Sequence, residues 1–169
     1  MKYSMPPVIS DNCKILILGA LPGERSLQLQ EYYAHPQNQF WRIICAILNE
    51  PMPNGYDSKK QLLLSHSIAL WDVVHSARRD DSSLDSKIKN AVPNDLGSLL
   101  SKYKNIQRIL LNGGKANSLF KMYFKHLDIK AVAVPSTSPA YASMCIGDKM
   151  KLWMNAIYIG GEKRGQVCG

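Results

Sequence analysis

The sequence lacks the patterns by which proteins bind metals or enter membranes. Its four cysteines are far apart, without a C-x-x-C pair or a histidine at metal-ligand spacing, so we expect neither a metal nor an iron–sulfur site. No segment approaches the ~20 apolar residues that span a bilayer, and the N-terminus has no signal-peptide pattern. We therefore expect a soluble protein in the cytoplasm, associated with the nucleoid if the cell is prokaryotic.

Acidic residues are also scarce. The 169-residue chain has 21 lysines and arginines against 13 aspartates and glutamates, which gives a formal net charge of +8. Such an excess favours a polyanionic partner. The length is that of one ordinary domain, so residues 1–169 are expected to form a single domain.

Two glycine-containing segments fall short of the common nucleotide-binding motifs. Residues 19–23 (GALPG) are not G-x-G-x-x-G, the dinucleotide fingerprint. Residues 112–115 (NGGK) resemble a phosphate loop, but a Walker motif has four residues between its glycines and a Ser or Thr after the lysine, where Ala116 stands here. Taken alone, each segment is a tight turn from a strand into a helix.

The chain does contain four apolar runs of strand length, at residues 14–18, 67–71, 108–111 and 130–134. Between them lie segments whose apolar residues recur at three- and four-residue steps, as in helices. Strands that alternate with helices indicate a parallel sheet covered on both faces. The sequence therefore predicts an α/β fold, a three-layer α/β/α sandwich.

Ligands of such sheets bind beyond the carboxyl ends of the strands. Those ends are residues 19–23, 72–79, 112–115 and 135–141, and we expect the functional site to be built from them. Residues 80–90 (DDSSLDSKIKN) are polar and are expected to form a loop or a weak helix.

Residues 32–41 (YYAHPQNQFW) mix aromatic rings with polar side chains, for which an apolar core has no use. Proline is tolerated at the first position of a helix, so the first helix is expected to begin at the His-Pro pair in this stretch. Asn38 then lies in its first turn and faces the ligand end of the sheet. Phe40 and Trp41 are expected to anchor the helix in the core.

Tyr32 and Tyr33 precede this helix on a loop, where an aromatic ring can stack on a planar ligand. The alternative, a place in the core, fits Tyr32 better than it fits Tyr33.

Residues 135–141 (PSTSPAY) follow the fourth apolar run. The hydroxyls of Ser136, Thr137 and Ser138, held between two prolines, can donate to a phosphate from a stiff loop. A plain connecting loop is the alternative. Seven residues of this kind at the end of a strand favour contact with the phosphate backbone of a nucleic acid.

Five motifs in order carry a resemblance to a known family. They are G-A-L-P-G, S-L-x-x-Q-x-Y-Y-A-H-P-x-N-x-F-W, L-W-D-V, N-G-G-K-A and P-S-T-S-P-A-Y-A, within residues 14–153. Together they resemble the uracil-DNA glycosylase superfamily, most of all its hypoxanthine-DNA glycosylase branch and in part its mismatch-specific uracil and thymine branch. The resemblance implies a four-stranded parallel sheet between helices, and base excision without a metal or another cofactor.

The resemblance also implies where the chemistry takes place. Other branches carry an aspartate or asparagine at the position of Leu21 to activate the attacking water, which a leucine cannot do. The hypoxanthine branch is understood to use the asparagine of H-P-x-N-x-F-W, which is Asn38 here. Some relatives place a leucine that wedges into the duplex at the position of Ala140, and Tyr141 is the alternative wedge.

The remaining site residues are expected to contact the flipped base or the DNA backbone. Asn112 and Asp72 stand at strand ends where base-reading groups are expected, although Asp72 fits a helix cap as well. The expected base-binding residues are Tyr33, Asn112, Gly19, Leu21 and Asp72. The expected DNA-binding residues are Ser136, Thr137, Ser138, Pro139, Ala140, Tyr141 and Lys115. A solvated face fits His75, Arg78 and Arg79 better than contact with phosphate does.

We expect a monofunctional DNA glycosylase that flips out a deaminated base and hydrolyses its N-glycosidic bond, with hypoxanthine as the first candidate base. Uracil or thymine opposite guanine is the alternative. An amide is not a strong base, so Asn38 is expected to orient water through its carbonyl oxygen or to donate to the departing base. No lysine stands at an obvious nucleophile position, which disfavours strand cleavage through a Schiff base.

A nucleic-acid-binding domain without catalytic activity is the alternative of another class. Leu21 supports it and Asn38 opposes it. The expected partner is double-stranded DNA that contains deaminated bases; a monomer is expected, and no membrane contact is.

Overall fold

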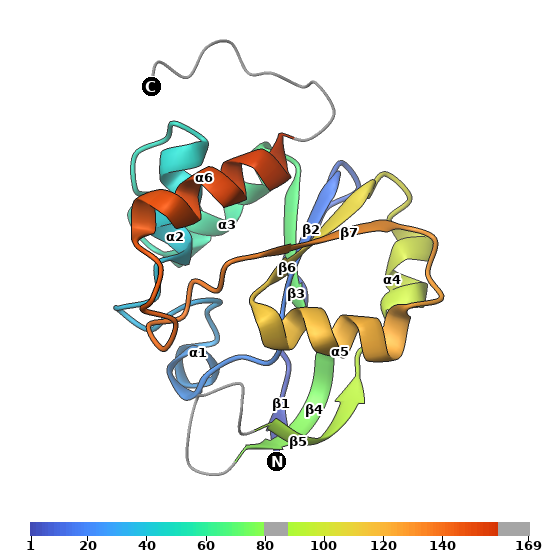
Figure 1. Cartoon of the computed structure of the whole chain (residues 1–169). Helices are drawn as coiled ribbons and strands as arrows, with labels where there is room; N and C mark the ends of the chain where they lie inside the picture. Colours follow the sequence, from blue (N-terminus) through green and yellow to red (C-terminus); the bar gives the residue numbers. More distant parts are fainter. Residues whose placement is uncertain (80–87, 159–169) are drawn as a thin grey trace.

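Four parallel strands form the central sheet of the computed structural model, which describes residues 1–79 and 88–158 (Figure 1). They are β2 (Ile15–Gly19), β3 (Ile68–Asp72), β6 (Arg108–Asn112) and β7 (Lys130–Val134), in the order β3-β2-β6-β7. All neighbouring pairs are parallel. The predicted four-stranded parallel sheet is confirmed, and its strands end at one shared edge.

Strand β2 shows how an apolar run builds both faces of this sheet. All five of its residues are buried. Ile15 and Ile17 pack in the core on one face, whereas Leu16 and Leu18 pack in the core on the other. A parallel strand that is buried on both faces therefore has an uninterrupted apolar sequence.

Helices cover both faces, so the predicted three-layer architecture is confirmed (Figure 1). One face packs against α2 (Phe40–Ile47), α3 (Tyr56–Ser65) and α6 (Ile146–Ile157), and the other against α4 (Leu96–Lys102) and α5 (Gly114–Phe124). The short α1 (Glu24–Leu29) follows β2 after four residues and lies near the carboxyl edge of the sheet. In the described part of the chain, no helix combines the length and the apolar character of a membrane span.

A second, antiparallel sheet was not foreseen from the sequence. Its strands are β1 (Lys2–Tyr3), β4 (Val74–Arg79) and β5 (Ile88–Pro93), in the order β1-β4-β5. Strand β4 starts two residues after β3 ends, so residues 74–79, which we placed at the carboxyl end of a strand, form a strand of their own. In the polar stretch 80–90, residues 88–90 belong to β5 and are neither loop nor helix, and residues 80–87 lie outside the described residues.

The expected start of the first helix was wrong. The first helix is α1, and the next helix, α2, begins only at Phe40 with Gln39 as its N-cap. The His-Pro pair lies before it in a turn, closed by the Asn38 amide N–H, which donates to the His35 carbonyl at 2.9 Å. The side chain of Asn38 also bonds to the helix start, because its Oδ1 accepts from the Phe40 N–H at 2.9 Å. Such a bond satisfies an orphan donor of the first turn from outside the helix.

Candidate active site

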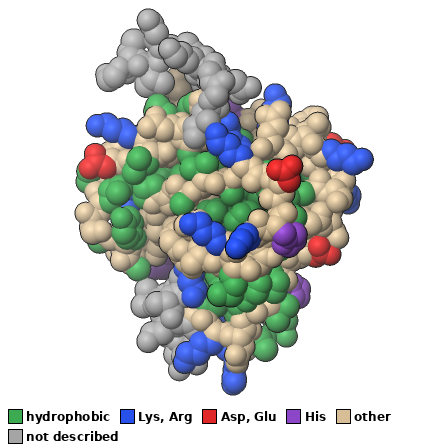
Figure 2. All heavy atoms as spheres, turned by 45° about the vertical axis from the view of Figure 1, so that its right-hand side comes forward, with side chains coloured by type: hydrophobic (Ala, Val, Ile, Leu, Met, Phe, Trp, Pro, Cys, Tyr) green, Lys and Arg blue, Asp and Glu red, His purple; other side chains and the backbone are tan. Residues whose placement is uncertain are grey.

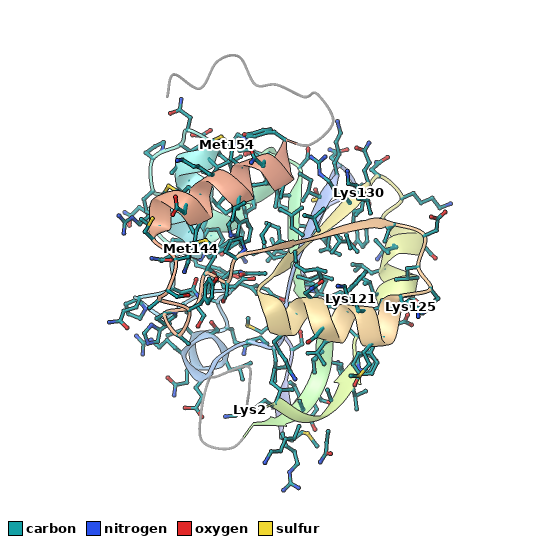
Figure 3. The ribbon with its side chains drawn as sticks, in the orientation of Figure 1. Lys2, Lys121, Lys125, Lys130, Met144 and Met154 are labelled. Carbon is teal, nitrogen blue, oxygen red and sulfur yellow. The ribbon has the colours of Figure 1, made fainter. Side chains whose placement is uncertain are left out.

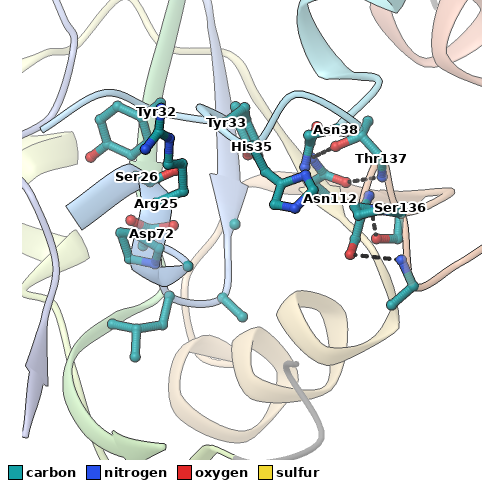
Figure 4. A pocket seen from close by; sticks show the side chains of 18 residues that line it. Arg25, Ser26, Tyr32, Tyr33, His35, Asn38, Asp72, Asn112, Ser136 and Thr137 are labelled. Atoms are coloured by element: carbon teal, nitrogen blue, oxygen red, sulfur yellow. Dashed lines mark hydrogen bonds between the residues drawn. The ribbon is translucent and has the colours of Figure 1, made fainter. Parts of the chain in front are cut away.

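A pocket with a volume of about 350 Å³ opens where the central strands end, as the topology rule predicts (Figure 4). Its walls come from the turn after β2, the loop before α2, the last residues of β3 and β6, and the loop after β7. Of the expected site residues, all except Lys115 and Tyr141 line it, namely Gly19, Leu21, Tyr33, Asn38, Asp72, Asn112, Ser136, Thr137, Ser138, Pro139 and Ala140.

The amide of Asn38 is held at one atom and open at the other. Its Oδ1 accepts from the Phe40 N–H, which fixes the orientation of the side chain. Within residues 1–79 and 88–158, its Nδ2 donates to no protein atom. The fixed orientation and the place of Asn38 in the pocket wall leave this donor and one lone pair of Oδ1 for a ligand or water.

Leu21 offers the pocket only hydrocarbon. Its side chain is 5% exposed and belongs to the apolar cluster on the α4 and α5 face of the sheet. The turn after β2 therefore brings no water-activating side chain from this position.

Asn112 is engaged at both atoms of its amide. Its Nδ2 donates to Thr137 Oγ1 at 3.0 Å, and its Oδ1 accepts from the Thr137 N–H at 3.1 Å (Figure 4). Gly113 permits this close approach: its φ is +96°, and a Cβ there would lie 3.0 Å from Ser136 Cβ. The N-G-G-K motif thus fastens the loop after β7 to the end of β6.

The hydroxyls of this loop are ordered by the loop itself. Ser136 Oγ accepts from the Ser138 N–H, and Ser138 Oγ accepts from the Ala140 N–H, both at 3.2 Å. Each oxygen is thereby fixed, and neither hydroxyl hydrogen is donated to a protein atom within the described part of the chain. Thr137 differs, because it is only 1% exposed and its oxygen already accepts from Asn112. Its burial and its bonds to Asn112 give Thr137 a structural role in the loop, and its contact with phosphate stays a prediction.

Asp72 brings a carboxylate to the opposite side of the pocket. It is 4% exposed, and its Oδ2 accepts from Ser4 Oγ at 3.3 Å. A Cβ at Gly19 would lie 2.7 Å from Asp72 Oδ1 and 3.3 Å from the Tyr33 hydroxyl, so both groups approach β2 where it has no side chain. The alternative role as a helix cap is wrong, since strand β4 follows Asp72.

The two tyrosines before α2 have different surroundings. The Tyr33 ring stacks on Phe40 with centroids 4.1 Å apart and planes at 24°, so only its other face is left for a base. Tyr32 is 3% exposed, and its hydroxyl donates to the carbonyls of Met5 and Pro6. This burial raises the pKa of Tyr32. Tyr32 is therefore a core residue, and the stacking platform is reduced to Tyr33.

Three polar residues in the pocket wall were missed from the sequence: Arg25, Ser26 and His35. Ser26 is buried, and its Oγ accepts from the Ala34 N–H at 3.1 Å, which ties the loop before α2 to α1. His35 projects into the pocket, and its Nδ1 accepts from the Gln37 N–H at 3.1 Å (Figure 4). A neutral His35 ring therefore carries its proton on Nε2. The signal for His35 was its place in the H-P-x-N motif.

The two expected site residues outside the pocket lie close by. Lys115 is half-buried in the first turn of α5. Tyr141 follows the hydroxyl loop and is 38% exposed. His75 and Arg78 are exposed on β4, as expected for a solvated face, and the side chain of Arg79 lies outside the description.

Basic side chains are spread over the surface beyond the pocket. Figure 2 shows Lys and Arg side chains scattered over the face that carries α5, with few Asp or Glu side chains among them. Lys121 and Lys125 project from α5, and Lys130 lies at the start of β7 (Figure 3). On this face the positive charge is therefore distributed and is not gathered at one point.

Known proteins resemble this chain over most of its length. The profile of the Uracil DNA glycosylase superfamily matches residues 6–158. A hypoxanthine DNA glycosylase of Methanosarcina barkeri is 38% identical over 116 residues, 68% of this chain and 73% of that protein. A hypoxanthine DNA glycosylase of Methanosarcina acetivorans is 33% identical over 141 residues, 83% of this chain and 88% of that protein.

A solved structure resembles this chain in its fold as well. The solution NMR structure of a candidate uracil DNA glycosylase from Methanosarcina acetivorans superposes with a TM-score of 0.80 and 31% identity, covering 92% of this chain and 96% of that chain. The extent of the profile match, the sequence identities and the shared fold establish that the chain belongs to the Uracil DNA glycosylase superfamily.

Proposed function

We propose that this protein is a monofunctional DNA glycosylase that removes hypoxanthine from deoxyinosine in double-stranded DNA. Two relatives that bear the name hypoxanthine DNA glycosylase support this substrate. The observation that carries the proposal is the pocket amide of Asn38, oriented by Phe40 and open at Nδ2, opposite a Leu21 that has no polar group. We propose further that it acts as a monomer of one domain, in the cytoplasm.

The target nucleotide must leave the duplex before it reaches this pocket. Flipping costs a few kcal/mol and costs least for a mispaired or damaged base, which favours deaminated bases from the outset. A volume of about 350 Å³ lies within the range of small-ligand sites and gives a flipped nucleotide room. The face of the Tyr33 ring that is turned away from Phe40 then stacks on the base.

Cleavage of the N-glycosidic bond passes through an oxocarbenium-like sugar, and the departing base gains negative charge. Asn38 Nδ2 is the open donor that hydrogen-bonds to this charge. The second lone pair of Oδ1 accepts a hydrogen bond from the attacking water and aims the water oxygen at the sugar. An amide takes up no proton at neutral pH, so the contribution of Asn38 is positioning and electrostatic stabilisation.

The buried carboxylate of Asp72 is proposed to read the base. Hypoxanthine presents an N1–H donor beside its O6 carbonyl, and Asp72 can accept that hydrogen when it is ionised. Uracil presents N3–H beside O4 in the same arrangement. Asp72 thus recognises the keto form that deamination creates, while the walls of the pocket select for size.

The loop of residues 136–141 is proposed to hold the phosphate backbone. Ser136 and Ser138 can donate their hydroxyl hydrogens to phosphate. Because their oxygens already accept from backbone N–H groups of the loop, the loop is ordered before DNA binds, and binding costs little conformational entropy. Lys115 adds positive charge in the neighbouring helix α5. Binding that depends on such contacts weakens as the salt concentration rises.

One assay tests the proposed function. Duplexes that carry inosine, uracil, xanthine or thymine opposite each normal base are incubated with the protein under single-turnover conditions, and abasic sites are cleaved with alkali. Product from inosine before alkali treatment would show strand cleavage by the protein itself and would contradict a monofunctional enzyme. Efficient product from inosine and little from uracil supports the proposal.

The same assay separates the alternatives. Efficient product from uracil opposite guanine, with little from inosine, would identify a mismatch-specific uracil glycosylase, which the structural relative named as a candidate uracil DNA glycosylase favours. No product from any duplex, combined with tight DNA binding, would identify a nucleic-acid-binding domain without activity. The observation that favours this inactive domain is the apolar Leu21, which stands where other branches of the superfamily carry the water-activating residue.

A further inference from the structure

A lysine lies inside the protein beneath the DNA-contacting loop. Lys149, on α6, is 1% exposed. Its Nζ donates to Gln39 Oε1 at 2.9 Å and to the Tyr141 carbonyl at 2.8 Å, and it lies 5.0 Å from the centroid of the Tyr141 ring. Two neutral oxygens and an aromatic face therefore surround the ammonium group.

This arrangement is costly for a residue that only fills space. In the part of the chain that the structure describes, Lys149 forms no ion pair with a carboxylate. A buried ammonium without a counter-ion is disfavoured, and burial accordingly lowers the pKa of Lys149. A methionine would fill similar space without this cost. The identity of the residue is therefore explained by what its charged group connects.

Lys149 connects the proposed catalytic segment to the proposed DNA-binding loop. Gln39 follows Asn38 directly and is the N-cap of α2. Its backbone N–H donates to the Thr137 carbonyl at 3.0 Å, near the beginning of the loop. Through Lys149, the Gln39 side chain is also joined to Tyr141 at the far end of the loop. Both ends of the loop are thus fastened to the residue beside Asn38.

We propose that Lys149 is a positioning residue that holds the loop of residues 136–141 at a fixed distance from Asn38. This inference rests on the proposed glycosylase function. DNA bound by the loop then presents its flipped nucleotide to the amide in the reactive geometry. A displacement of about 1 Å at a reacting centre can cost 10²-fold in rate, so a loop released at one end slows the reaction while its contacts to phosphate remain.

The test replaces Lys149 by methionine, which keeps the hydrocarbon chain and removes the donors. Single-turnover excision from an inosine duplex is expected to fall about 10- to 100-fold, whereas the Kd for the same duplex rises less than fivefold. Lys151→Met is the matched control, because Lys151 is exposed on the same helix and its replacement removes the same charge. Both quantities are expected to stay within twofold of wild type in the control.

A second variant shows whether Lys149 acts through Gln39. Gln39→Met removes the side-chain acceptor and keeps the backbone bond to Thr137. If the two side chains act as one unit, Lys149→Met and Gln39→Met combined slow excision about as much as Lys149→Met alone. Additive losses, or excision by Lys149→Met within threefold of wild type, would overturn the inference. If Lys149→Met does not fold, Gln39→Met alone must show the loss in rate at little change in Kd.

Failure of the proposed function would be recognised separately, because wild type itself would then excise no base. In that case amide hydrogen exchange tests whether Lys149 holds the loop of residues 136–141 in place. The Tyr141 N–H donates to the Ser138 carbonyl at 3.0 Å, so its exchange reports on the closed loop. Faster exchange at Tyr141 in Lys149→Met but not in Lys151→Met supports the connection, and equal exchange in all three proteins overturns it.

Discussion

The turn before α2 and the carboxyl end of β6 each place one asparagine in the same pocket, yet the two amides differ in their partners. Asn112 gives both of its amide atoms to Thr137. Among residues 1–79 and 88–158, Asn38 engages only its Oδ1, which accepts from the Phe40 N–H. An amide with both of its polar atoms bound to the protein is fixed in place and orders the wall of the site, with one N–H and one lone pair remaining. An amide fixed at one atom and open at the other is prepared for a ligand.

The largest expected effect tests the open amide. Asn38→Ala is expected to reduce single-turnover excision of hypoxanthine by about 10²–10³, equivalent to roughly 3–4 kcal/mol, because one preorganised contact to the reacting atoms is lost. The Kd for an inosine duplex should change little, since the phosphate contacts remain. Excision within a few-fold of wild type would show that the catalytic group lies elsewhere.

Asn38→Asp sharpens the same test. A carboxylate keeps an acceptor for the Phe40 N–H and an acceptor for water, but it has no donor for the departing base. A rate as low as that of Asn38→Ala identifies donation by Nδ2 as the main contribution, whereas a rate near wild type identifies the orientation of water.

The closed amide is expected to matter for order more than for chemistry. Asn112→Ala leaves the Thr137 N–H without its buried partner, which is expected to cost about 1–3 kcal/mol of unfolding free energy and to weaken DNA binding about tenfold. Chemical denaturation and binding titrations measure both. Thr137→Val is the matched variant, since it removes only the hydroxyl partner and should lose less. A loss in rate like that of Asn38→Ala at unchanged affinity would remove the distinction between the two amides.

A smaller effect is expected at the third polar group of the pocket, the carboxylate of Asp72. Gly19→Ala introduces a Cβ 2.7 Å from Asp72 Oδ1, so this buried side chain must shift and excision is expected to fall several-fold. Gly147→Ala is the control, because a Cβ there meets no atom within 4 Å. Equal rates in the two variants would show that the placement of Asp72 does not affect the reaction.

The smallest expected effect is a dependence on pH. Burial lowers the pKa of Lys149, so the contacts that its ammonium makes weaken as the pH rises through a folded-state pKa below that of an ordinary lysine. Excision should therefore decline by less than tenfold as the pH rises toward the pKa of an ordinary lysine. The unfolded state binds more protons in this interval, so this group makes folding more favourable as the pH rises. Loss of activity without loss of stability is thus the expected signature.

Two variants test whether Lys149 causes this decline of excision at rising pH. Lys149→Met should lack it. The ring of Tyr141 packs on the ammonium, and Tyr141→Phe keeps this ring while removing the phenol hydroxyl. A decline that persists in Lys149→Met, or that disappears in Tyr141→Phe, would assign the titration to another group.

The central sheet was predictable because its strands are buried on both faces and therefore have uninterrupted apolar sequences. The place of the pocket followed, since parallel strands that succeed one another end at one edge. The second sheet was not predictable in this way. Its edge strand β1 has two residues, and β5 has near its start two neighbouring exposed polar residues, Lys89 and Asn90, which resemble part of a polar loop.

The roles of single polar side chains were harder to predict from the sequence than the fold was. Thr137 is one of three neighbouring hydroxyl residues in the sequence, but it is buried and hydrogen-bonded to Asn112, which lies 25 residues earlier in the chain. Lys149 lies in a helix with one other lysine, and its partner Gln39 is 110 residues earlier. No local pattern distinguishes Lys149 from the exposed Lys151.

The sequence by itself determined the class of fold, the edge of the sheet that carries the site, and the superfamily, because these depend on periodic burial and on motifs that are local in the chain. Only the tertiary structure decided which amide is open, which hydroxyl is buried and which lysine is inside. The physical reason is that the state of a polar group depends on whether a partner or water meets it, and folding brings those partners together from distant parts of the chain.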